Sequence, residues 1–284
     1  MKKIGTLIFA FVFLALFSSN LLAGDNAEFK FIGFSEDGKY LAFEESGEWD
    51  GAGGEYATTY FINVEKNIFA AAPAVYEWGS DGEKESLRMP RLTRYKRSVA
   101  DNLKKFRIER GNLGKIVAAH LPGDHSFDKP GLREGYFYEK DGTGKNKMVP
   151  YYEGDFLSPD YDPSRIVFTT VEYSVNPPDE SYYELKLNYT PTPLKCQLYA
   201  GDTESAAEGI ELTIKPNINH ADLPIQILQK DKIIPANRQC PSSYSIEQVW
   251  YYEGKIAVFL NYHKRGFEGD DMRYMVVTGK LEEK

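Results

Sequence analysis

Cysteine is scarce, with two residues, Cys196 and Cys240, in a chain of 284. No C-x-x-C spacing occurs, which excludes the zinc and redox sites that use this motif. The G-x-S-x-G nucleophile elbow, the Walker A sequence and the dinucleotide glycine pattern are also missing. The sequence therefore contains none of these nucleotide-binding motifs. A hydrolase would have to assemble its catalytic site from residues that are distant in the sequence.

Long apolar runs are missing after the first 17 residues. Before that point, Lys2 and Lys3 precede an apolar stretch from Ile4 to Phe17. The pattern predicts a signal peptide over residues 1–23, cleaved after Ala23. The alternative is an uncleaved anchor, although a bilayer span needs about 20 residues. We predict a periplasmic or secreted protein with no transmembrane span in the mature chain.

Positive net charge is missing too, because the chain has 34 Lys and Arg residues and 42 Asp and Glu residues, which gives a net charge of −8. Cleavage after Ala23 would remove Lys2 and Lys3 and give −10. Proteins that bind nucleic acids need a basic footprint. No nucleic-acid partner is therefore predicted.

An exported chain with a single pair of cysteines favours a disulfide. We predict a bond between Cys196 and Cys240. Closing this loop of about 45 residues would stabilise the fold by about 4 kcal/mol in the chain-entropy model. Two buried free thiols or a metal-binding pair are the alternatives.

Aromatic residues are abundant, with 20 Tyr and 17 Phe, and they suit β-strands. The Asp37-Gly38 pair between two such runs predicts a hairpin with a type I′ turn. When the sequence is shifted by 216 residues, Gly38 falls on Gly254 and the following strands also match. A shift of 126 residues matches Tyr56 with Tyr182.

These shifts predict three related hairpin units near 29–64, 155–188 and 245–280, inside a single secreted β-rich domain over residues 24–284. Chance agreement of the spacing is the alternative. The offsets are multiples of about 42–45 residues, a period typical of β-propeller blades. The hairpin sequence Ser35 to Phe43 also resembles the first hairpin of propeller blades in periplasmic translocation-associated proteins and prolyl peptidases. The predicted fold is therefore mainly β and antiparallel, and a β-propeller is one architecture that fits.

One amphipathic helix, at about residues 83–108, interrupts the β pattern. Its apolar stripe is formed by Leu92, Tyr95, Val99, Leu103 and Phe106. Nine Lys or Arg residues lie between Arg88 and Arg110, against two acids. This excess is either a solvated outer face, a partner for acidic loops of the same chain, or a docking surface. The candidate binding residues are Arg91, Arg94, Arg97, Lys104, Lys105 and Arg107, and an envelope protein, polysaccharide or other anionic ligand is the predicted partner.

Metal-ligating residue types gather in the sequence HLPGDHSFD, at His120, Asp124, His125 and Asp128. Their spacing fits no helical zinc motif, so ordinary loop polarity is the preferred interpretation and no metal site is predicted. Acids also recur in the predicted loops 46–55, 172–181 and 262–271. If these loops gather on one face, they offer a Ca²⁺ site or an acid pair, and solvated hairpin tips are the alternative.

Four segments carry a family resemblance. They are FSEDGKYLAFEE (34–45), DPSRIVF (162–168), RQCPSSYSIEQV (238–249) and RGFEGDDMRYMVVTG (265–279). In this order they resemble a bacterial family of predicted secreted proteins of unknown function, over about residues 29–280. The resemblance implies secretion and a single domain, and it assigns no catalytic residue.

We therefore expect an exported, non-catalytic module that binds an envelope component. The alternative is an envelope hydrolase that uses an acidic pair or a His-based site. No cofactor is predicted.

Overall fold

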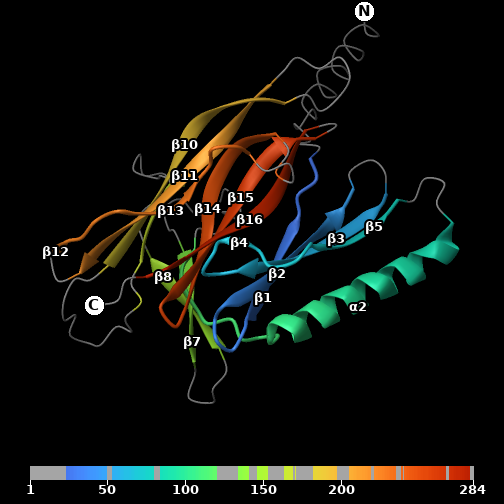
Figure 1. The fold of residues 1–284 in the computed structure, drawn as a ribbon, viewed down its shortest axis with the longest axis horizontal. Helices are drawn as coiled ribbons and strands as arrows, with labels where there is room; N and C mark the ends of the chain where they lie inside the picture. Colours follow the sequence, from blue (N-terminus) through green and yellow to red (C-terminus); the bar gives the residue numbers. More distant parts are fainter. Residues whose placement is uncertain are drawn as a thin grey trace, which may run out of the picture.

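In the part of the chain that the structure describes, the fold is mainly β, with antiparallel strand pairing and one α-helix (Figure 1), which confirms the fold class expected from the sequence. The computed structural model describes residues 24–49, 53–79, 84–119, 134–140, 146–152, 163–168, 170, 182–196, 205–218, 221–234, 238, 240–266 and 269–281. The propeller architecture is not confirmed, because the described strands form three larger sheets and one small hairpin.

The first sheet has the order β1-β2-β3-β4, with β5 also paired to β3. Its strands are β1 (Glu28–Phe34), β2 (Tyr40–Glu48), β3 (Glu55–Asn63), β4 (Ile68–Phe69) and β5 (Ala74–Trp78). The central sheet has the order β16-β15-β14-β6. Its strands are β6 (Lys115–Ala119), β14 (Pro241–Tyr252), β15 (Lys255–Arg265) and β16 (Asp270–Lys280).

The third sheet has the order β12-β11-β10-β9, with β13 also paired to β11. Its strands are β9 (Arg165–Phe168), β10 (Tyr182–Cys196), β11 (Ser205–Ile218), β12 (Ala221–Asp222) and β13 (Gln226–Lys230). The remaining strands, β7 (Glu134–Lys140) and β8 (Asn146–Tyr152), pair with each other.

Four layers stack in the order helix, first sheet, central sheet and third sheet (Figure 1). Strand β15 shows why the central sheet is buried on both faces: Val258 packs in the cluster shared with the third sheet, and Phe259 packs in the cluster shared with the first sheet. The continuous apolar run from Ile256 to Leu260 is typical of such a strand.

The helix α2 (Arg88–Phe106) follows a short 3-10 turn, η1 (Glu85–Leu87), and covers the outer face of the first sheet. The predicted apolar stripe is confirmed, since Tyr95, Val99, Leu103 and Phe106 are buried and Leu92 packs at the edge of the same cluster. The Tyr95 hydroxyl also donates a hydrogen bond to the Glu44 carboxylate of β2. The chain then crosses from the first sheet to β6 of the central sheet.

The three predicted hairpin units differ in their register. Phe43 pairs with Tyr60 in the first unit, and Phe259 pairs with Val276 at the equivalent positions of the third unit. In the second unit, the shift of 126 residues would pair Lys186 with position 169. Lys186 pairs instead with Arg165, four residues earlier. The β2–β3 pair of the first unit and the β15–β16 pair of the third unit therefore share one register, and their relation as repeats stays a prediction.

The predicted type I′ turn at Asp37-Gly38 is wrong in detail. Gly38 has a positive φ of 62° and Asp37 does not, and the loop closes through a hydrogen bond from the Gly38 amide to the Ser35 carbonyl. The turn with two positive φ values is Glu253-Gly254, which joins β14 to β15 in the third unit. In the longer loop between β1 and β2, the Lys39 amide donates to the Asp37 carboxylate and the Tyr40 amide donates to the Ser35 hydroxyl. These two side chains stabilise the loop.

Candidate functional site

The predicted binding residues lie along α2 and the turn that follows it, and we call them the basic surface: Arg91, Arg94, Arg97, Lys104, Lys105 and Arg107. All except the half-buried Arg91 are exposed. Arg91 lies over the Trp78 ring at 5.9 Å and donates a hydrogen bond to the Glu77 carbonyl at 3.4 Å. The other side chains point away from the core because the apolar stripe occupies the inner face of the helix.

The exposed cations of the basic surface have no ion-pair partner among the described residues. Arg88, at the start of α2, behaves differently. It pairs with Glu55 of β3 at 2.9 Å and with Glu85 at 3.5 Å. The charge of α2 is therefore compensated at its start, and the described acids do not pair with the exposed cations further along the helix.

The end of α2 places Arg107 in an unusual backbone conformation. Arg107 has φ 54° and ψ 37°, the left-handed region where glycine is normally found. The Ile108 amide bonds to the Leu103 carbonyl and the Arg107 amide bonds to the Lys104 carbonyl, which together form a Schellman motif. A non-glycine residue in this conformation costs roughly 1 kcal/mol. The helix therefore ends on a cation although glycine would be more stable there.

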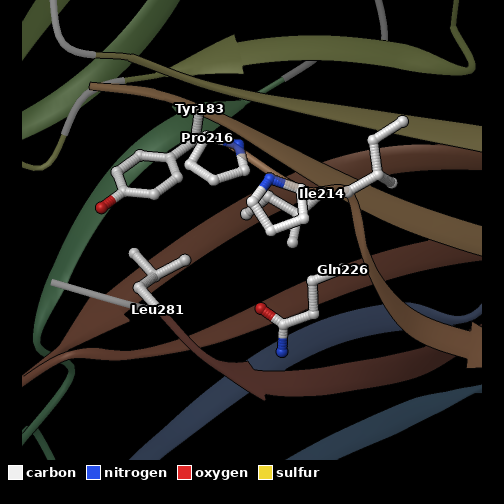
Figure 2. Close-up of a pocket in the computed structure, with 7 residues that line it drawn as sticks. Tyr183, Ile214, Pro216, Gln226 and Leu281 are labelled. Carbon is white, nitrogen blue, oxygen red and sulfur yellow. The ribbon is translucent and has the colours of Figure 1, made fainter. Parts of the chain in front are cut away.

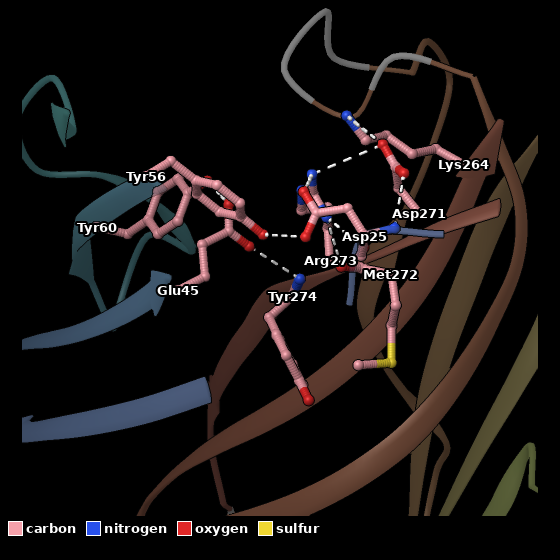
Figure 3. Close-up of polar contacts among 9 residues, drawn as sticks. All are labelled: Asp25, Glu45, Tyr56, Tyr60, Lys264, Asp271, Met272, Arg273 and Tyr274. Atoms are coloured by element: carbon pink, nitrogen blue, oxygen red, sulfur yellow. Dashed lines mark hydrogen bonds and ion pairs between the residues drawn. The ribbon is translucent and has the colours of Figure 1, made fainter. Parts of the chain in front are cut away.

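A second polar site is buried between the chain start, the first sheet and the edge of the central sheet (Figure 3). We call it the Asp25 cluster, and its residues are Asp25, Glu45, Tyr56, Tyr60, Lys264, Asp271 and Arg273. Arg273 Nη2 lies 2.6 Å from Asp25 Oδ2, and its Nη1 donates to the Asp25 carbonyl at 2.7 Å. Both side chains are about 5% exposed, so this ion pair is shielded from solvent.

The remaining members of the Asp25 cluster surround this ion pair. Tyr56 donates its hydroxyl to Asp25 Oδ1 at 3.2 Å, and the Tyr56 ring lies 4.9 Å from the Arg273 guanidinium carbon. Asp271 accepts from the Asp25 amide at 3.1 Å and lies 3.6 Å from Arg273 and 3.8 Å from Lys264. Burial, followed by the neighbouring Arg273, lowers the pKa of Lys264, and Asp271 opposes this effect.

Glu45 links the first sheet to the edge of the central sheet and accepts from one side-chain donor and one main-chain donor. Its carboxylate accepts from the Tyr60 hydroxyl and from the Tyr274 amide of β16. Burial raises the pKa of Glu45, and these two hydrogen bonds oppose the increase. The amides of Met272 and Thr278 on the same strand donate to Asp25 and Asn67. Three main-chain amides on the open edge of β16 therefore have hydrogen-bond acceptors within the protein, which protects this edge from pairing with another chain.

Glu247 is a buried carboxyl group inside β14, at a β-bulge between Ile246 and Gln248. One of its oxygens, Oε2, has no hydrogen-bond partner among the described residues. Burial raises the pKa of Glu247 to about 7, although hydrogen bonds from the Asn261 and Tyr274 side chains oppose this. Among the described residues, no second carboxyl group contributes to this shift, so the pKa of Glu247 gives no support for the acid pair of a glycosidase.

Arg238 forms another buried ion pair, with Asp231. The two guanidinium nitrogens lie 2.6 Å and 2.7 Å from the Asp231 carboxylate oxygens, and Nη1 also donates to the Tyr244 hydroxyl at 3.2 Å. The Asp231 carboxylate also accepts from the Ile210 amide of β11. This arrangement fixes the segment before β14 to the third sheet, and its side chains are saturated by one another.

A cavity of about 240 Å³ lies between the third sheet and the chain end after β16 (Figure 2). Its lining is Tyr183, Ile214, Pro216, Pro224, Ile225, Gln226 and Leu281. Among these residues there is no carboxylate, histidine or nucleophile. Typical ligand pockets have about 300–1,000 Å³ and several convergent polar groups. The cavity therefore gives the hydrolase alternative no support.

The weak metal candidates His120, Asp124, His125 and Asp128 lie outside the described residues. Within the part of the chain that the structure describes, no group of three or more His, Cys, Asp or Glu residues is placed to hold a metal ion. The predicted loop 262–271 is wrong, because β15 continues to Arg265 and β16 begins at Asp270. Likewise β2 and β3 extend to Glu48 and Glu55, which shortens the predicted loop 46–55. Loop 172–181 lies outside the described residues, so the Ca²⁺ interpretation stays a prediction.

Cys240 is buried beside Ala207 and Ile234. Strand pairing sets Cys196 opposite Ser205, two residues from Ala207, but the Cys196 side chain lies outside the described part. The disulfide therefore stays a prediction.

Sequence reasoning missed the Asp25 cluster and the Asp231–Arg238 pair. The available signal was a charged residue at a position where the strand pattern requires an apolar one, such as Arg273 within MRYMVVT.

A family model described as "Predicted secreted protein (DUF2259)" matches residues 42–280. The chain belongs to this family. DUF2259 denotes a domain of unknown function, and its description agrees with a periplasmic or secreted location. No curated protein and no solved structure matches the chain. Among the described residues of this DUF2259 protein, no helix is long and apolar enough to cross a membrane.

Proposed function

We propose that this DUF2259 protein is a non-catalytic binding module of the cell envelope, and that the basic surface of α2 binds an anionic partner. The observation that carries the proposal is the set of exposed cations without ion-pair partners among the described residues. The chain as a whole is acidic, with a net charge of −8, so this concentration of positive charge runs against its composition.

Helix stability accounts for Lys104 and Lys105, which lie in the last turn where the helix dipole favours cations, but not for the other cations of the basic surface. A helix start favours acidic residues because its amide groups carry partial positive charge, yet the first turn of α2 contains Arg91 of the basic surface and no acid. Arg94 and Arg97 are three residues apart and repel each other on the same side of the helix. Arg107 occupies a left-handed position where glycine would be more stable. Residues kept at a cost to stability are expected at functional sites.

The length of the basic surface favours an extended partner over a small ion. Arg94 and Arg107 are 13 positions apart, which corresponds to about 20 Å at 1.5 Å per helical residue. Protein interfaces have apolar cores depleted of charge, whereas the basic surface is charged along its length, and the exposed apolar side chains near it, Leu87 and Met89, lie only at its Arg91 end. An acidic polysaccharide of the envelope is therefore the partner class that fits best, and an acidic protein is the alternative outcome of the test.

The test is a charge-reversal variant, Arg94→Glu, Arg97→Glu and Lys104→Glu. Each exposed contact is worth roughly 0.5–1 kcal/mol, so loss of three contacts should weaken binding by about 10-fold to 150-fold. The folding free energy should change by less than about 0.5 kcal/mol, because these exposed side chains lie away from the core. The matched control changes Lys66, Lys186 and Lys232 to Glu, which alters the net charge equally at exposed positions outside α2.

The readout is binding to dextran sulfate, with uncharged dextran as a second control, and then to polysaccharide and protein fractions of the envelope. Binding of the native protein should weaken with salt because exposed charges are screened over about 10 Å at 0.1 M. Equal binding of the reversal variant and its control would contradict the proposal. Capture of an acidic protein in place of polysaccharide would keep the basic surface as the site and change its partner.

We also propose the Cys196–Cys240 disulfide as a covalent link within this module. It is supported by the burial of Cys240 and by the strand register that brings residue 196 near Ala207. The bond would join the end of β10 to the segment before β14.

A further inference from the structure

The beginning of the described chain is built into the fold. Asp25 is 6% exposed, and its amide, carbonyl and carboxylate all form hydrogen bonds within the Asp25 cluster. Asn26 forms a parallel bridge with Met272, and the Ala27 amide donates to the Met272 carbonyl at 3.1 Å. The residues directly after the predicted cleavage site thus form the border of the central sheet.

Gly24 itself lies against the main chain of Asp270. A Cβ atom at this position would come within 2.2 Å of the Asp270 carbonyl oxygen, a distance that atoms cannot adopt without displacing the segment. Only glycine fits here without such a shift. A small residue is thus required by packing at the position that the signal-peptide pattern selects as the first residue of the mature protein.

The Asp25 cluster has more negative than positive groups. Asp25, Glu45 and Asp271 provide three carboxyl groups, whereas Arg273 and Lys264 provide two cations. The neighbouring Asp270 is the strand partner of Arg265 in the β15–β16 pair. Buried carboxylates are stable when cations or hydrogen-bond donors surround them, so one further positive charge would balance this site.

We propose that the α-ammonium group of Gly24, freed by cleavage after Ala23, supplies that charge, so that signal-peptide removal completes the Asp25 cluster. The cleavage is hydrolysis by a signal peptidase: one water molecule is consumed, the Ala23–Gly24 amide bond breaks, Ala23 keeps the carboxylate and Gly24 keeps the amine. The amine takes a proton from solvent at neutral pH, because its usual pKa is about 8.

The geometry places the new charge within reach of the acids. The Asp25 amide nitrogen lies 3.1 Å from Asp271 Oδ1. Three covalent bonds with a summed length of about 4.3 Å connect it to the Gly24 nitrogen, so the ammonium lies within about 7 Å of that oxygen. Gly24 is also partly exposed, so a peptidase product can be hydrated and titrated there. Opposite charges within about 4–6 Å raise the pKa of an amine, and the upper bound of about 7 Å allows the ammonium to reach that range.

This proposal depends on the predicted signal peptide and is independent of the basic surface. The first measurement is the N-terminal sequence of the exported protein, which should begin at Gly24. The second is the α-amino pKa of that protein, followed by ¹³C NMR after reductive methylation. It should lie about one unit above the usual value, and Asp271→Asn should return it toward that value.

A third comparison leaves every side chain intact. The protein that begins at Gly24 should unfold at a higher temperature than the same chain acetylated at Gly24 or extended by Ala23. A folded-state amine pKa above the unfolded value gives stability at low pH that is lost as pH rises through the folded pKa. The advantage should therefore be present at pH 7 and disappear above about pH 10. A different N-terminus, or an α-amino pKa at its usual value, would overturn the proposal.

Discussion

Glu247 offers a test of how burial controls the stability of the central sheet. The carboxyl group is 7% exposed, has one oxygen without a hydrogen-bond partner among the described residues, and has a pKa raised by burial from 4.5 to about 7. The folded state therefore holds a proton that the unfolded state releases between about pH 4.5 and pH 7. Because the folded state binds more protons in this window, stability falls as pH rises through it.

The magnitude follows from the shift. A displacement of about 2.5 units at about 1.4 kcal/mol per unit gives a penalty of about 3.5 kcal/mol above pH 7. Glu247→Gln removes the titration and keeps the shape of the side chain. Its amide nitrogen can replace the oxygen that has no partner, and any cost of burying that amide is the same at every pH. Between pH 5 and pH 8, the free energy of unfolding of the variant should increase relative to the native protein by about 2.5 kcal/mol.

The assay is urea unfolding of both proteins at pH 5, 6, 7 and 8. Glu253→Gln is the matched control, because Glu253 is exposed in the turn of the same hairpin and should show no such trend. A difference between Glu247→Gln and the native protein that stays constant across this range would refute the reasoning, since it would mean that Glu247 titrates normally in the folded state.

Three further perturbations have defined outcomes. Arg107→Gly should stabilise the fold by about 0.5–1 kcal/mol, because glycine accepts the left-handed conformation, and should weaken polyanion binding, as thermal melts and titrations would show. Arg238→Ala should destabilise by about 3–5 kcal/mol, because it leaves Asp231 buried and unpaired, whereas the double change Asp231→Leu with Arg238→Met should cost less in the same urea assay. Peptide mass analysis without reduction should show Cys196 linked to Cys240, and two alkylatable thiols in the folded protein would contradict the disulfide.

Local features of the fold could be predicted from the sequence. The helix was expected over about 83–108 and is found as η1 and α2 over 85–106, because its apolar stripe and end signals lie within one continuous segment. The aromatic and β-branched runs likewise marked β2, β3, β15 and β16. Their boundaries were less accurate: β15 and β16 extend into the predicted loop 262–271, since main-chain pairing continues through polar residues such as His263 and Lys264.

The four-layer arrangement and the buried polar clusters could not be predicted, because they depend on contacts between distant segments. Strand β6 joins β14 across more than 120 residues, and Arg273 meets Asp25 across 248 residues. A charged residue in a strand indicates neither its partner nor its burial until the sheets are stacked. The basic surface was accessible to sequence reasoning because its members share one helix.

The most direct test of the central claim is the salt dependence of dextran sulfate binding by the native protein and by the Arg94→Glu, Arg97→Glu, Lys104→Glu variant. The basic surface predicts tight binding at low salt that weakens steeply with salt in the native protein, and binding at least about 10-fold weaker with a shallower salt dependence in the variant. The control with Lys66, Lys186 and Lys232 changed to Glu should bind like the native protein. If the two triple variants lose binding equally, or if neither does, the basic surface of α2 is not the binding site.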